Sequence, residues 1–143
     1  MNENIELMKC IYKNAEMACS ALEDALKYLK DKDNKIKDAI HDLSEDYQNF
    51  KDRAKDMLSE DDLTENNPFG KMMASMGIKK EIDNDNSDAS VADMLIQGIS
   101  MGSIEIEKKL GEFENHSQKE TIKLAKEFKK FQEKSIDKLK KYL

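Results

Sequence analysis

Four long stretches of the chain carry apolar residues at spacings of three and four, the period of a helix with one apolar face. This spacing predicts helices over about residues 3–30, 35–58, 88–114 and 118–142. About three residues separate the helices within each pair, whereas roughly 28 residues, Ser59–Asn86, separate the two pairs. The short–long–short pattern predicts two helical hairpins joined by a crossover, which is one way to build a four-helix bundle.

The second stretch has the most regular pattern of the four. Its apolar residues alternate in steps of four and three, as left-handed bundle packing requires. They are Ile36, Ile40, Leu43, Tyr47, Phe50, Ala54 and Met57. Each long helix would measure about 36–42 Å at 1.5 Å per residue, a length along which the connector can run back. The second and third long helices would then be parallel, and the alternative is that the connector only covers one end of the bundle.

The connector contains signals for a helix of its own. Asn67 followed by Pro68 is typical of a helix start, and Gly77 fits a position just past a helix end. We therefore expect a short helix over about residues 68–76, with a loop after Ile82.

Two of the long helices also have candidate start signals. Asp33 or Asn34 would be the N-cap of the second long helix. Ser117 and Glu120 have the spacing of a capping box at the start of the fourth. In the third, Gly98 and Gly102 lie four residues apart, which would let a neighbouring helix or a partner's side chains come close.

Composition adds limits to this picture. The 143 residues suit a single domain over 1–143, and 38% are hydrophobic and 38% charged. A net charge of −6 argues against nucleic-acid binding. No run of 18 apolar residues predicts a membrane span, and the N-terminus, with Glu3 and Glu6, is unlike a signal peptide.

The chain has two cysteines, and nine residues of predicted helix separate them. They therefore face opposite sides and cannot bridge one another. Cys19 lies at the edge of the apolar stripe and is expected in the core, whereas Cys10 is expected to point away. Two unpaired thiols without an export signal favour the cytoplasm.

Two segments carry a resemblance to a known class of proteins. KMMASMGIKKE (Lys71–Glu81) and DMLIQGISMGSIEIEKKL (Asp93–Leu110) place a short helix before a long helix rich in small residues and carboxylates. This layout resembles that of small uncharacterised ferritin-like four-helix-bundle proteins of bacteria. The resemblance implies a crossover bundle and raises the question of a di-metal site, in which two helices supply a Glu each and two supply Glu-x-x-His.

The chain departs from that metal-binding pattern. Its only histidines are His41 and His116, and neither has a Glu three residues before it. We therefore predict no metal ligands and no cofactor, and expect both histidines at exposed or turn positions. If the alternative of a metal-binding or redox protein holds, the ligand pool would be Glu16, Glu23, His41, Glu105 and Glu107.

The absence of reactive motifs directs the functional prediction toward binding. The chain has no phosphate-binding glycine loop, nucleophile elbow or C-x-x-C motif, so no catalytic residue is predicted. We expect a non-catalytic binding or structural protein that contacts a protein partner or forms a homo-oligomer. A small regulatory or immunity-type protein is a further alternative. Apolar residues left at the edges of the stripes form the candidate interaction surface: Met72, Met73, Met76, Met94, Met101 and Tyr12.

Overall fold

The computed structural model describes residues 2–63 and 68–143. Within these two ranges every regular element is helical and there is no strand, which confirms the prediction of an all-α protein. The α-helices are α1 (Glu3–Tyr28), α2 (Lys37–Asp56), α3 (Pro68–Asn84), α4 (Asp88–Phe113) and α5 (Lys119–Leu139). Two short 3-10 helices follow α2 and α5, η1 (Glu60–Leu63) and η2 (Lys140–Tyr142).

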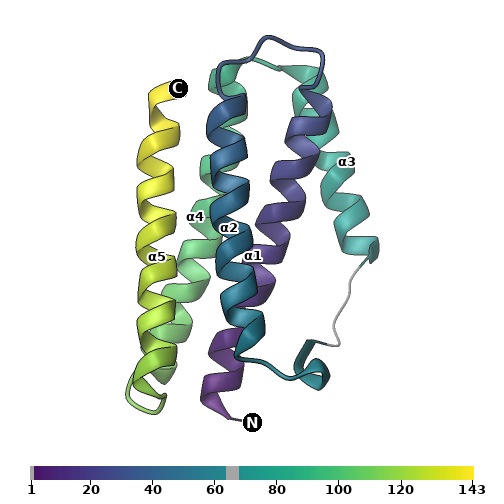
Figure 1. Ribbon diagram of the computed structural model, residues 1–143. Helices are drawn as coiled ribbons and strands as arrows, with labels where there is room; N and C mark the ends of the chain where they lie inside the picture. The colour runs from purple at the N-terminus through teal and green to yellow at the C-terminus, as the bar shows by residue number, and fades with distance from the viewer. Residues whose placement is uncertain (1, 64–67) are drawn as a thin grey trace.

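The helices form two antiparallel pairs, α1 with α2 and α4 with α5 (Figure 1). Between the pairs, α3 runs back alongside α1, so that α2 and α4 point in the same direction (Figure 1). Helix α1 packs against α2, α3, α4 and α5, and is therefore the central helix of the fold.

Helix α3 is longer than the sequence suggested. The prediction that Gly77 ends it is wrong, because Gly77 lies inside a helix that continues to Asn84. Ile78 and Ile82 follow at i, i+4 spacing and pack against the core. Burial of these two side chains stabilises the longer helix by more than the roughly 1 kcal/mol that a glycine inside a helix costs. The predicted start signal at Asn67 lies outside the described residues.

The central position of α1 explains a second error. Cys10 was expected to point away from the core, but only 6% of its surface is exposed, and Leu7 is fully buried as well. Because other helices cover α1 on several sides, a wider arc of it is buried than a single stripe would give. Cys19 is buried, as predicted.

The predicted stripe of α2 meets α5 through an aromatic cluster. Tyr47 packs edge-on against Phe131, with ring centroids 4.9 Å apart, and against Phe128 at 5.8 Å. Phe50 lies 5.1 Å from both phenylalanines. Edge-to-face and offset geometries at these distances are the favourable ones for aromatic pairs, so this cluster holds the two hairpins together.

The N-terminus of α2 is capped by a residue from another helix. Asp88, the first residue of α4, accepts hydrogen bonds from the backbone N–H groups of Lys35 and Ile36 at 3.2 and 3.4 Å. The predicted cap by Asp33 or Asn34 is wrong, because the N-cap residue is Ile36. Asn34 instead donates its side-chain amide to Asp88, at 2.9 Å.

The start of α5 is also capped from elsewhere, so the predicted capping box of Ser117 and Glu120 is wrong. The N-cap residue is Gln118, whose backbone N–H donates to the side-chain oxygen of Asn4 in α1 at 2.6 Å. The hydroxyl of Ser117 is buried and has no hydrogen-bond partner among the described residues. We call these two contacts trans caps, because Asp88 and Asn4 each belong to the other hairpin. They join the two hairpins at opposite ends of the molecule (Figure 1).

Candidate binding site

An open apolar groove of about 630 Å³ lies between α3 and α4, with α1 as its floor. It exists because α3 and α4 both pack on α1 while their small residues leave space between them. Its inner surface carries small side chains from all three helices, Ala18, Ala21, Ala74, Gly98 and Gly102. A Cβ atom added at Gly98 would meet no heavy atom of the described residues within 4 Å, so the groove reaches the backbone of α4 there.

Flexible methionines border this groove. Met101 of α4 is 73% exposed and Met17 of α1 is 45% exposed, while Met94 is half-buried. Unbranched thioether side chains adapt their shape to different ligands, which is why they are frequent at promiscuous binding surfaces. The groove therefore has a fixed floor and an adaptable border.

The two ends of the groove differ in polarity. Lys13, Asn14 and Glu105 line one end. Ile78 and Leu95 line the other, together with Leu22 and Met94. Helices α1 and α4 run antiparallel (Figure 1), and the hydrogen bond from Asn14 to the Gly102 carbonyl sets these polar residues at the same level.

A chain of hydrogen bonds crosses the bundle at the polar end. Asn14 donates to the carbonyl oxygen of Gly102 at 2.9 Å, and Gln132 of α5 donates to the side-chain oxygen of Asn14 at 3.0 Å. The same amide nitrogen of Gln132 lies 3.4 Å from the hydroxyl of Tyr47. Because α1, α2, α4 and α5 each supply one member, this polar layer fixes their relative register.

The polar layer has one unsatisfied atom. Gln132 is fully buried, and its side-chain oxygen has no hydrogen-bond partner among the described residues. Burial also raises the pKa of Tyr47, which keeps its hydroxyl protonated. The layer is therefore neutral and has no proton donor or acceptor poised for catalysis near neutral pH.

Polar contacts attach α3 to α1 along the groove. Lys71 pairs with Glu16 at 2.7 Å, and the hydroxyls of Ser75 and Tyr28 lie 2.8 Å apart. Burial by itself would raise the pKa of Glu16, but hydrogen bonds from Lys71 and Tyr12 outweigh it and lower that pKa. Glu16 is therefore charged at neutral pH and holds the first half of α3 in place.

The structure divides the predicted interaction surface into three parts. Met94 and Met101 lie at the groove, where they join Met17, a residue the sequence prediction omitted. Tyr12 is half-buried on the side of α1 that faces α2, where its ring lies 5.8 Å from the ammonium of Lys51.

The third part is the α3 methionine surface, which we define as Met72, Met73 and Met76. These side chains are 52%, 51% and 58% exposed. They belong to the helix that borders the groove, but they are not among the residues that line it. The structure therefore places the predicted residues at the groove, on α3 outside the groove lining, and beside α2.

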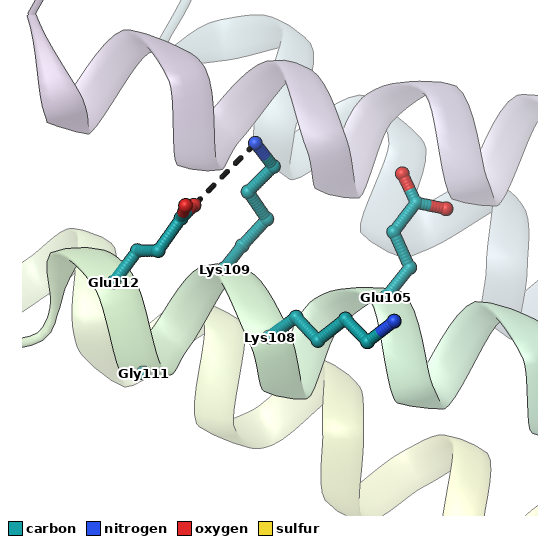
Figure 2. Close-up of a pocket in the computed structure, with 5 residues that line it drawn as sticks. All are labelled: Glu105, Lys108, Lys109, Gly111 and Glu112. Carbon is teal, nitrogen blue, oxygen red and sulfur yellow. Dashed lines mark ion pairs between the residues drawn. The ribbon is translucent and has the colours of Figure 1, made fainter.

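A second hollow of about 500 Å³, which shares Glu105 with the groove, lies over the second half of α4. It is lined by charged residues, and Figure 2 shows Glu105, Lys109 and Glu112 extending from α4 toward α1. Lys109 pairs with Glu112 at 3.6 Å, and Glu105 accepts a hydrogen bond from the thiol of Cys10 at 3.6 Å. Because positive and negative groups alternate, this hollow favours neither an anion nor a metal cation.

The carboxylates of the proposed metal-ligand pool are engaged separately. Glu16 pairs with Lys71, and Glu107 pairs with Lys129 at 3.4 Å. In the described ranges, 2–63 and 68–143, no three His, Cys, Asp or Glu side chains gather into a group that could hold a metal ion. His41, Glu23 and His116 are exposed, at separate places on α2, α1 and the turn before α5.

Sequence reasoning missed the polar layer, although one signal for it was present. Gln132 lies at i+4 from Phe128 and at i−3 from Ser135, which places it in the buried register of α5. A polar residue in that register indicates a buried hydrogen bond, because an unpaired amide in a core is costly. Asn14 carries no comparable signal, since it is half-buried beside the stripe of α1.

Comparison with known proteins adds no relative. No family model, no curated protein and no solved structure matches this chain. None of the helices in the described part of the chain is long and apolar enough to cross a membrane.

Proposed function

We propose that this chain is a non-catalytic binding protein that acts through contacts with another protein chain. Self-association, in which the other chain is a second copy, is the version of this proposal that can be measured directly. The α3 methionine surface carries the proposal. Met72, Met73 and Met76 are each more than half exposed, on a helix whose main packing partner among the described residues is α1.

The charge pattern of α3 supports this proposal. In a chain that is 38% charged, the segment from Lys71 to Ile78 has a single charged residue. That residue, Lys71, is paired with Glu16 of α1. Protein interfaces are depleted of charged residues and enriched in methionine at their centres, so this surface has the composition of an interface.

We infer also that the architecture is the crossover form of a four-helix bundle, as in ferritin-like folds. The parallel course of α2 and α4, with α3 as the connecting segment, supports this inference (Figure 1). Within this arrangement, the hydrogen bond between Gln132 of α5 and Asn14 of α1 joins one hairpin to the other.

Sedimentation equilibrium across the micromolar range tests the proposal. We expect wild-type chain to associate, and the double variant Met72→Lys, Met76→Lys to weaken association by at least about tenfold, because two buried apolar contacts would be replaced by like charges. The control is Met57→Lys, at a methionine of similar exposure (41%) just beyond α2. A wild-type chain that stays strictly monomeric, or a control as disruptive as the double variant, would refute self-association through this surface.

A further inference from the structure

We propose that the groove between α3 and α4 binds one single-chain amphiphile, an unbranched aliphatic chain of about ten carbons with a small uncharged head group. This inference goes beyond the protein contact proposed above and does not depend on it. The contact concerns Met72 and Met76, whereas this site concerns the groove lined by Met17, Met94 and Met101.

The size of the groove favours a small ligand. Its volume of about 630 Å³ lies within the range of roughly 300–1,000 Å³ that is usual for small-molecule sites. Along α1 it extends from Lys13 to Leu22, which is about 14 Å at 1.5 Å per residue. A stable protein interface needs about 800 Å² on each partner, more than a groove of this length offers, so a partner helix is the weaker occupant.

The shape of the groove favours an extended chain. Ala18 and Ala21 on the floor, and Gly98 on the α4 side, leave the inner surface without protruding side chains. Methylene groups lying on that floor would contact Cβ atoms and backbone, and the methionine side chains at the border could close over them. Each methylene group of an aliphatic chain contributes favourable free energy when it leaves water, and it requires no polar partner. Such a chain therefore suits walls that are mostly apolar.

The polarity of the two ends fixes the direction and the head group. The apolar end, with Leu22, Ile78 and Leu95, would hold the terminal methyl group. The polar end, with Lys13 and Glu105, would hold the head. Because these two side chains have opposite charges, the attraction of a carboxylate head to Lys13 would be offset by its repulsion from Glu105, whereas a hydroxyl head can both donate to Glu105 and accept from an ammonium without meeting repulsion.

The methyl groups of the methionines can report where the ligand binds. We would label their methyl groups with carbon-13 and titrate the full-length protein with 1-decanol below its solubility limit. Shifts are expected at Met17, Met94 and Met101, which line the groove, and not at Met57 or Met76, which are exposed elsewhere. Equal shifts at all exposed methionines would show nonspecific adsorption and overturn the proposal, and so would the absence of any shift.

A matched pair of glycine variants tests the location independently. A Cβ atom has open space at both Gly98 and Gly111 of α4, but only Gly98 lines the groove. Gly98→Leu should weaken decanol binding by about tenfold or more, because it displaces about two methylene groups of the chain. Gly111→Leu should leave binding within about twofold, and equal affinities in the two variants would overturn the site.

Comparison of 1-decanol with decanoate tests the head group. We expect the alcohol to bind at least as tightly as the carboxylate, and markedly tighter binding of decanoate would overturn the assignment of an uncharged head. Monomeric wild-type protein that still binds decanol at the groove would separate this inference from the proposed self-association, since the methyl shifts do not require a second chain.

Discussion

Replacement of Gly102 by alanine is the sharpest test of the polar layer. A Cβ atom at this position would lie 2.7 Å from the side-chain oxygen of Asn14 and 2.8 Å from its nitrogen. Both distances are far below van der Waals contact, so the Asn14 amide must move. That amide cannot move freely, because it donates to the Gly102 carbonyl and accepts from Gln132.

The expected change in the free energy of unfolding follows from three contributions. Loss of the bond from Asn14 to the Gly102 carbonyl costs about 1 kcal/mol, and loss of the bond from the buried Gln132 to Asn14 costs about 2 kcal/mol, because it leaves a buried amide without its best partner. Alanine is more favourable than glycine in a helix interior, which stabilises the variant by about 1 kcal/mol. Gly102→Ala should therefore destabilise the protein by about 2 kcal/mol.

The same substitution elsewhere in α4 provides the control. Gly98→Ala and Gly111→Ala meet open space and should stabilise by about 0.5–1 kcal/mol, since they gain only the helix preference. Urea unfolding followed by far-ultraviolet circular dichroism would give the three values. A Gly102→Ala variant as stable as the other two would refute the argument.

A double-mutant cycle isolates the contact. With Asn14→Ala already present, Gly102→Ala should become stabilising by about 1 kcal/mol, because no amide remains in its way. The coupling energy between the two positions would then be about 3 kcal/mol. Additive effects would show that Asn14 and Gly102 do not interact.

Three further predictions concern the caps, the buried thiol and the attachment of α3. Asp88→Ala should cost about 1 kcal/mol and speed amide hydrogen exchange at Ile36, since the cap of α2 is lost; unchanged exchange at Ile36 would contradict the trans cap. Burial, and then the charge of Glu105, raises the pKa of Cys10 to about 12, so a thiol reagent at mildly alkaline pH should modify it only as fast as the protein opens; rapid modification of folded protein would refute this. The pKa of Glu16 is lowered on folding, so its contribution to stability is complete above the ordinary glutamate pKa and is lost as the pH falls through the folded value. Amide protection of α3 should decrease over that acidic range, and Glu16→Gln should abolish the pH dependence; a dependence that persists in the variant would have another source.

The extent of the long helices could be predicted because each depends mainly on its own periodic pattern. The range predicted for the third, 88–114, differs from the structure by one residue at its end, since α4 spans Asp88–Phe113. The regular stripe of α2 was likewise found buried at Ile40, Leu43 and Tyr47. Local apolar periodicity is sufficient where a helix buries one face against its neighbours.

The features that depend on distant residues could not be predicted in this way. The caps of α2 and α5 are supplied by Asp88 and Asn4, more than 50 and more than 100 residues away in sequence. The local candidates, among them Ser117, satisfied the sequence rule without making the bond. A cap rule recognises a residue type at a position, whereas the unpaired N–H groups donate to any suitable oxygen that the tertiary structure brings near.

The candidate binding site was anticipated only in part for the same reason. Met94 and Met101 were identified as surplus apolar residues, and both lie at the groove. Met17 was missed because it lies outside the stripe of α1, and Tyr12 was included although it faces α2. Which surplus residues share a site depends on where α3 packs against α1, and no pattern within a single helix contains that information.

The two trans caps also bear on how the chain could be divided. Each hairpin begins one of its helices with a bond from the other hairpin, through Asp88 to α2 and through Asn4 to α5. If the backbone were cut between η1 and α3, the two fragments would each have a frayed helix end. Mixed together, they should restore each other by complementation, and each half would thereby serve as the folding template of the other.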